Sequence, residues 1–231
     1  MKLWVIGGTV VVAIALLLVG TKEASMERIA PPQLSEEEQS YLLDAARSAL
    51  RAHLAGEPAP AVDEEALSDA LKTEAACFVT LTVGGRLRGC ILDSFVPHES
   101  IVRNVMRNVV LAATGDPRFP PVTIGEFESI AIEISALGRS YAIAFDDPEE
   151  LAAALRPGLD GVILTTTFGS STYLPQVWEQ IPDPEQFLTE LCRKHGAPGD
   201  AWRTGDLLRV EVYQVTHFAE GEGASTGSGG D

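Results

Sequence analysis

A pair of glycines, Gly84-Gly85, joins two apolar runs and strongly constrains what this chain can fold into. A two-residue Gly-Gly link between apolar segments is typical of a β-hairpin, because glycine adopts the positive φ angles that such tight turns require. The pattern therefore predicts paired strands over Ala75–Val83 and Arg86–Leu92. A sheet that contains this hairpin is at least partly antiparallel.

The other expected elements do not follow a regular strand–helix–strand repeat. Apolar spacing and capping residues predict a short helical piece over 64–72 and helices that begin at Ser35, Pro97, Asp147 and Asp183. Alternation and turn signals predict further strands over 129–137, 161–167, 172–174 and 208–218. Hairpins mixed with separate helices favour an α+β fold, with a largely antiparallel sheet flanked by helices.

Composition shifts along the chain suggest four parts. A chain of 231 residues can form one large domain or two small lobes around a buried core. We assign a hydrophobic N-terminal segment to 1–25, a linker to 26–34, the folded domain to 35–219, and a Gly/Ser-rich tail, expected to be disordered, to 220–231.

The N-terminal segment contains an uncharged run, Leu3–Val19, between Lys2 and Lys22. Signal-peptide cores are usually about 7–15 residues long, and membrane-spanning helices need about 17–25. No convincing cleavage site follows the run, so we favour a single uncleaved anchor that attaches the protein to a membrane. A cleaved signal peptide stays open, as does a true start at Met26, which would leave the protein in the cytoplasm.

Charge and missing motifs argue against several functional classes. The formal net charge is -16 with only 17 basic residues, whereas binding a nucleic-acid backbone needs clustered Lys and Arg. We therefore expect no nucleic-acid partner. The sequence contains no phosphate-binding glycine loop, no GxSxG or HExxH motif and no iron–sulfur cysteine set, so we expect no cofactor.

Three widely spaced cysteines form neither a disulfide framework nor a zinc-finger pattern. They indicate free thiols in a reducing compartment, which conflicts with export through the N-terminal segment. Cys77 and Cys192 lie among apolar residues, and we interpret both as structural.

The third cysteine, Cys90, is the strongest candidate for chemistry. Strict alternation along its strand would place Arg86 and Arg88 on the same face, and a nearby guanidinium favours the thiolate. Gly89 lets a backbone or a ligand approach closely, and Thr80 lies on the paired strand with its hydroxyl available to the same face. A buried structural cysteine is the competing interpretation.

Four more residues are secondary candidates. His98 precedes a helix and is a possible base for the thiol. Glu133 lies between two isoleucines, and a buried carboxylate needs a partner, so it is expected to orient an arginine or a substrate. Asp116 and Arg118 stand in a rigid proline-rich loop. Each of these residues also has an ordinary structural interpretation. His98 would be a surface or capping histidine, Glu133 would lie on a solvated strand face, and Asp116 and Arg118 would pair only with each other.

Metal binding is a weak alternative for part of this set. Cys90, His98 and Glu133 include possible ligands, but three mixed ligands are poor evidence for a site. We assign no metal ligand from the sequence.

Four segments, in the same order along the chain, resemble the AMMECR domain family, whose prokaryotic members are called AmmeMemoRadiSam system protein A. The likeness covers roughly residues 35–219. The matching segments are the cysteine-containing hairpin and three later motifs, at 78–91, 116–121, 132–135 and 174–185.

The resemblance implies a two-lobed α+β fold with the cysteine motif in a cleft between the lobes. It also implies that Gln176 and Trp178, in the fourth motif, line that cleft or face a partner. A functional association with a Memo-like protein and a radical S-adenosylmethionine (SAM) enzyme is implied as well. It does not imply a reaction, so whether the protein is an enzyme stays open.

Our leading hypothesis is an accessory or catalytic component of this three-part modification system. Cys90 would hold a covalent adduct, Arg88 and Arg118 would bind an anionic group and lower the thiol pKa, and Glu133 would orient the arginines. A non-catalytic module that binds a ligand or a protein is the alternative. A metal-handling protein is a weaker one.

Overall fold

The hairpin around Gly84-Gly85 is present and belongs to a four-stranded antiparallel sheet. The computed structural model describes residues 30–221. The two glycines have φ angles of 57° and 74°, as a tight turn of this kind requires. The strands are β1 (Cys77–Val83), β2 (Arg86–Ile91), β3 (Ile130–Leu137) and β8 (Val215–Ala219), in the order β2-β1-β3-β8.

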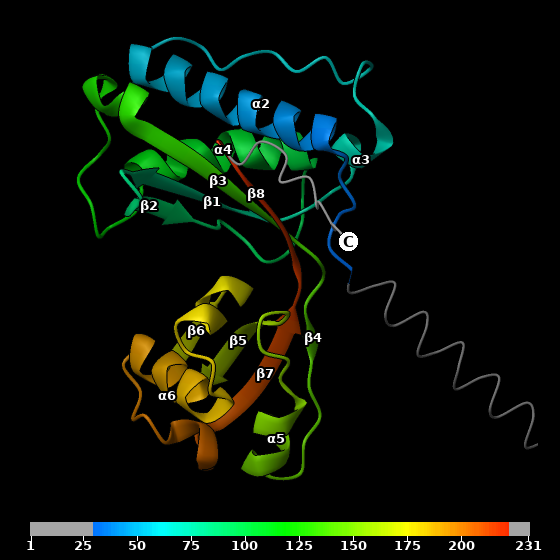
Figure 1. The fold of residues 1–231 in the computed structure, drawn as a ribbon, viewed down its shortest axis with the longest axis vertical. Helices are drawn as coiled ribbons and strands as arrows, with labels where there is room; N and C mark the ends of the chain where they lie inside the picture. The colour runs from blue at the N-terminus through cyan, green and yellow to red at the C-terminus, as the bar shows by residue number, and fades with distance from the viewer. Residues whose placement is uncertain (1–29, 222–231) are drawn as a thin grey trace, which may run out of the picture.

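Two long helices cover one face of this first sheet (Figure 1). α2 (Glu36–Ala55) begins after Ser35, which forms the predicted capping box with Glu38. α4 (Ile101–Thr114) packs beside it, and alternate side chains of β1 and β3 complete the core between sheet and helices. Two short elements, α3 (Asp69–Lys72) and the 3-10 helix η1 (Ile124–Ser129), flank this lobe.

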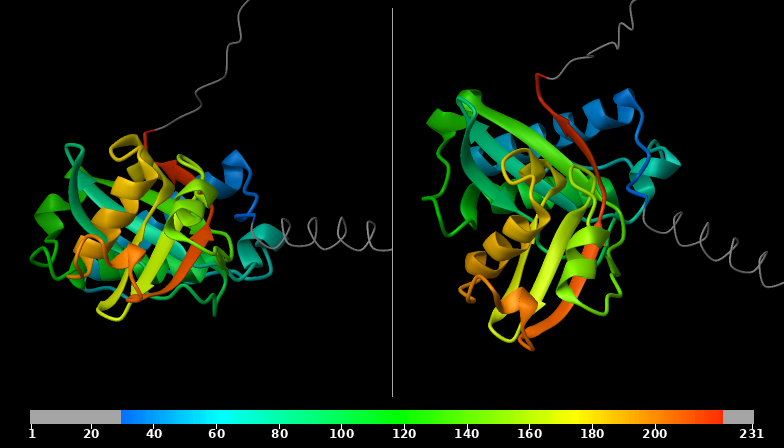
Figure 2. Two further views of the ribbon diagram at one scale, coloured as in Figure 1. Left: turned by 90° about the horizontal axis from the view of Figure 1, so that it is seen from below. Right: turned by 60° about the horizontal axis from the view of Figure 1, so that its bottom comes forward.

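A second lobe holds another antiparallel sheet of four strands (Figures 1 and 2). Its strands are β4 (Tyr141–Ala142), β5 (Gly161–Thr166), β6 (Gly169–Tyr173) and β7 (Leu207–Tyr213), in the order β4-β7-β5-β6. The helical elements are α5 (Pro148–Ala154), η2 (Pro175–Glu179), α6 (Pro184–Lys194) and η3 (Ala201–Arg203). The predicted α+β class and two-lobed form are confirmed, with the strands divided between two sheets.

The expected closing strand, 208–218, is a single extended segment that serves both sheets. β7 pairs within the second lobe, Gln214 follows, and β8 pairs with β3 in the first lobe, as Figure 2 shows. A small apolar cluster of Leu137, Ile163 and Tyr213 packs where the chain crosses between the lobes. This crossing fixes which face of the first sheet looks toward the second lobe.

The described residues include the start of the predicted C-terminal tail but not the N-terminal segment. Glu220, placed at the start of the disordered tail, is instead held by an ion pair with Arg47 and by main-chain contacts to Ile132. The run Leu3–Val19 and the alternative start Met26 lie outside the described residues. Within 30–221, no helix combines the length and apolar character needed to cross a bilayer.

Candidate functional site

Cys90 lies in a row of side chains that crosses three neighbouring strands. Thr80 of β1 is in register with Cys90 of β2 on one side and with Glu133 of β3 on the other. Val79 and Leu81, on either side of Thr80 in β1, point into the helix-covered core. The row therefore occupies the opposite face of the sheet, toward the second lobe. The Thr80 hydroxyl donates a hydrogen bond to Cys90 Sγ at 3.3 Å.

A β-bulge breaks the alternation expected along β2. Leu81 pairs with Gly89, but the next residue, Thr82, pairs with Leu87, so Arg88 is an extra residue in its strand. The prediction that Arg86 shares a face with Cys90 is therefore wrong, because the bulge reverses the order of faces before it.

The two arginines nearest Cys90 in sequence do not act on the thiol. Arg86 is exposed at the hairpin end. Arg88 Nε donates to Glu126 Oε1 at 2.8 Å and Arg88 Nη1 donates to Pro120 O at 2.9 Å. Arg88 thus ties β2 to η1 and to the proline-rich loop.

The loop pair Asp116 and Arg118 secures the free edge of β2. Cys90 N donates to Asp116 Oδ2 at 2.9 Å, and the Arg118 side chain donates to both carboxylate oxygens at 2.9 and 2.6 Å. Asp116 is only 4 % exposed, and its bonds to Arg118 hold the pKa of its carboxyl well below the usual range. This pair fixes the backbone of Cys90 and keeps a guanidinium beside the thiol.

The second lobe contributes a further cation, Lys194, at the end of α6. Its Nζ donates to Thr172 O at 2.8 Å and lies 4.6 Å from the centre of the Tyr173 ring. Burial and the charge of Arg118 lower the pKa of Lys194, so the two cations lie close enough to repel each other. Lys194 was not among the predicted site residues, because only the packing of the lobes brings it near Cys90.

The environment of Cys90 keeps its thiol protonated. Burial has the largest effect and raises the pKa of Cys90, against the smaller opposing effects of the Thr80 hydrogen bond and the charges of Arg118 and Lys194. The expectation that arginines give Cys90 a lowered pKa is therefore wrong in sign. The cations instead offset part of the cost of forming a thiolate there.

Comparison with known proteins identifies the fold and the family. A model of the AMMECR1 family matches residues 43–218, which is more than half of the chain. The chain belongs to the AMMECR1 family. The resemblance drawn from four sequence motifs is thus confirmed.

Several AMMECR1-type relatives match nearly over their full lengths. A protein of Methanothermobacter thermautotrophicus is 34 % identical over 188 residues, covering 81 % of this chain and 96 % of the relative. A protein of Methanocaldococcus jannaschii is 34 % identical over 192 residues, covering 82 % and 93 %. The crystal structure of an uncharacterized protein from Pyrococcus horikoshii has a TM-score of 0.71 at 30 % identity, covering 78 % of this chain and 90 % of that one.

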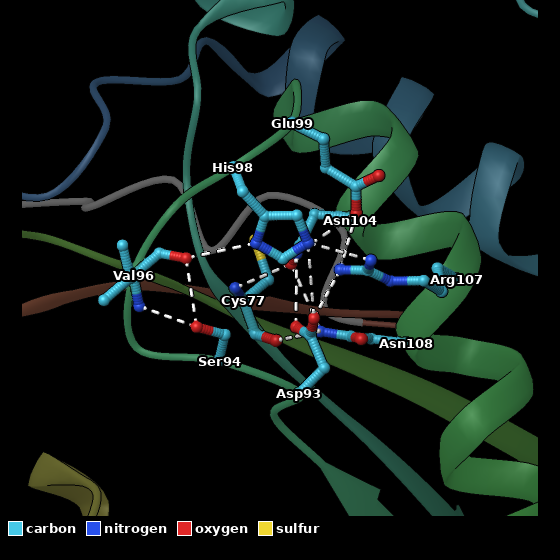
Figure 3. A network of polar contacts seen from close by, with 9 residues as sticks. All are labelled: Cys77, Asp93, Ser94, Val96, His98, Glu99, Asn104, Arg107 and Asn108. Carbon is cyan, nitrogen blue, oxygen red and sulfur yellow. Dashed lines mark hydrogen bonds and ion pairs between the residues drawn. The ribbon is translucent and has the colours of Figure 1, made fainter.

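His98 lies in a separate polar network of the AMMECR1 domain, shown in Figure 3. Its Nδ1 lies 3.2 Å from Val96 O and its Nε2 lies 2.9 Å from Arg107 Nη1. An arginine can only donate, so His98 Nε2 is the acceptor and Nδ1 carries the proton. The network joins the loop after β2 to α4, and His98 makes no contact with Cys90, so the expectation of a Cys–His pair is not supported.

The two residues of the fourth motif have different surroundings. Gln176 Nε2 donates to Ser135 Oγ at 3.4 Å, which links η2 of the second lobe to β3 of the first. Trp178, expected to line a cleft or face a partner, is only 3 % exposed and stacks on Phe187 with 3.7 Å between ring centres. That expectation is wrong for Trp178, which is a core residue of the second lobe.

The three possible metal ligands Cys90, His98 and Glu133 do not form one group. His98 is engaged in the network of Figure 3, apart from the row that holds the other two. Over residues 30–221, no group of three or more His, Cys, Asp or Glu side chains is arranged to hold a metal ion.

Proposed function

We propose that the lobe junction of this AMMECR1-family protein binds a small anionic ligand, and that Cys90 reacts with it as a nucleophile. The observation that supports this proposal is the convergence of Arg118 and Lys194, from opposite lobes, on one thiol. Asp116 neutralises part of the Arg118 charge, and Lys194 leaves a net positive charge beside the nucleophile, which favours an anion at that point in a chain of net charge -16.

A thiol with a raised pKa suits a reaction in which the thiolate forms only when the ligand is bound. In an addition to a carbonyl carbon, a bond forms between Sγ and that carbon while the carbonyl π electrons move to oxygen. The thiol proton passes to the same oxygen, so the step balances without an oxidant or a reductant. Arg118 and Lys194 would stabilise the thiolate character that develops on Sγ.

The wider role that we propose is a component of a three-part modification system with a Memo-like protein and a radical SAM enzyme. This part rests on the family resemblance alone. In such a reconstituted system Cys90→Ala should abolish turnover, and full activity of that variant would contradict a catalytic role for the thiol.

A second candidate function, a non-catalytic binding module, is favoured by the raised pKa of Cys90. The same two cations would then bind the anionic ligand without any covalent step. In that case Cys90→Ser retains ligand affinity, whereas Arg118→Met loses it.

The proposed anion site predicts an unusual preference between two alkylating reagents. Iodoacetate is anionic and iodoacetamide is neutral, but both react with the same thiolate, so the thiolate fraction cancels in the ratio of their rates. We expect the iodoacetate to iodoacetamide ratio at Cys90 to exceed that of glutathione by about fivefold, the size of a partly exposed charge interaction. Peptide mass spectrometry would report the rate at Cys90 alone.

Single variants separate the two cations from general effects of charge. Arg118→Met and Lys194→Met should each lower the ratio. Arg193→Met is the matched control, because Arg193 adjoins Lys194 but is paired with Glu190. A wild-type ratio equal to that of glutathione, or a ratio unchanged in both test variants, would overturn the proposal.

A further inference from the structure

Glu133 stands in the Cys90 row without a countercharge. Its neighbours in register are Thr80 on β1 and Ala219 on β8, and neither is charged. Among residues 30–221, its half-buried carboxylate makes no ion pair and accepts no hydrogen bond. A partly buried carboxylate is stabilised by a cationic donor, and the protein supplies none at this position.

The cations of the junction are held away from Glu133 by their own contacts. Arg118 is bound to Asp116, and Lys194 is bound to the main chain at Thr172. Neighbouring strands are about 4.8 Å apart, so two strand spacings place the backbones of Glu133 and Cys90 about 10 Å from each other. The junction therefore presents opposite charges at two separate points along one face of the sheet.

A second acceptor lies near the Glu133 end. Ser135 follows Glu133 by two residues and so shares its face of β3, and Gln176 reaches Ser135 from the second lobe. Gln176 Oε1 is buried and has no hydrogen-bond partner among the described residues. Buried acceptors normally have a donor, so Gln176 Oε1 is available to a donor group of a ligand. His217 of β8 also lies at this end, with its Nδ1 3.1 Å from Ser135 Oγ.

We infer that the ligand of the junction is a small zwitterion, with an anionic group at Arg118 and Lys194 and an amine at Glu133. The inference rests on the anion site of the proposed function and adds the chemical class of its ligand. A molecule of this class bridges the Lys194 ammonium and the Glu133 carboxylate, which have no ion-pair partner among residues 30–221, while Arg118 adds a guanidinium that is also bound to Asp116. Ligands with a single charge satisfy only one end.

Three six-carbon probes test the inference: 6-aminohexanoate, hexanoate and hexylamine. Each is added while Cys90 is alkylated by neutral iodoacetamide, and protection is read by peptide mass spectrometry. We expect 6-aminohexanoate to protect Cys90 at about fivefold lower concentration than hexanoate, the size of one added ion pair. Hexylamine should protect least.

Variants assign the two ends of the ligand. In Glu133→Gln, 6-aminohexanoate and hexanoate should protect Cys90 equally, because the amine no longer meets a carboxylate. Glu128→Gln is the control, at an exposed glutamate of η1, and should behave as wild type. Arg118→Met should weaken protection by both acids.

Equal protection by hexanoate and 6-aminohexanoate in the wild type, or protection by neither, would overturn the inference. The proposed function would still stand in either case if the iodoacetate preference at Cys90 is observed, because that preference does not depend on Glu133.

Discussion

Replacing Gly89 with alanine should lower the free energy of unfolding by about 3 kcal/mol, at the upper end of overpacking effects. A Cβ at this position would lie 2.1 Å from the main-chain oxygen of Ala112 in α4. The clash is with backbone, so no side-chain rotation relieves it, and trimming Ala112 would not help. Strand β2 would have to move away from the helix and carry Cys90 with it.

Chemical denaturation measures this loss. Gly205→Ala is the matched control, since a Cβ there meets no atom within 4 Å and the residue does not need a positive φ. It should change stability little. If Gly89→Ala were as mild as Gly205→Ala, the close contact of β2 with α4 would be contradicted, together with the reason for a glycine beside the cysteine.

Asp116→Asn should destabilise the protein by about 2–3 kcal/mol, because hydrogen bonds to charged groups contribute strongly. Asp116 accepts from Cys90 N and from three donors of Arg118, which an amide cannot do. Since the folded-state pKa of Asp116 is lowered, its stabilisation is complete above the ordinary aspartate pKa of about 3.9 and declines as the pH falls below it. Denaturation at several pH values should show this decline in the wild type and less of it in Asp116→Asn.

A similar pair in the second lobe provides the control. Asp160 is 1 % exposed and is bound by Arg156 in the same manner, away from Cys90. Asp160→Asn should also destabilise the protein, but only Asp116→Asn should speed alkylation of Cys90, because the Asp116 charge raises the pKa of that thiol. Equal alkylation rates in the two variants would show that Asp116 has only a structural role.

Local sequence signals predicted much of the first lobe. The Gly84-Gly85 turn and the Ser35–Glu38 capping box depend on residues close together in the chain, and both are present. The prediction of the sheet face that Arg86 occupies was wrong. Alternation assumes an unbroken strand, whereas the bulge at Arg88 depends on how two strands pair.

The site itself depends on packing between the lobes. Lys194 comes from a helix far along the chain, and no local pattern links it to Cys90. The pKa of Cys90 is raised because the thiol is buried, and sequence motifs do not show how deeply a residue is buried. The closeness of Arg86 and Arg88 to Cys90 in sequence therefore did not predict which arginine acts on the thiol. The charge of Arg118 does act on it, and its role in binding an anionic group stays a prediction.

The pH dependence of Cys90 alkylation, compared between wild type and Lys194→Met, tests most directly whether both lobes act on the thiol. Peptide-resolved rates give the apparent pKa of Cys90 itself. We predict a wild-type value above the ordinary thiol pKa of about 8.5, and a still higher value in Lys194→Met because a cation that favours the thiolate is lost. A wild-type value below 8.5, or a value that does not change in Lys194→Met, would contradict a buried thiol shared between the two lobes.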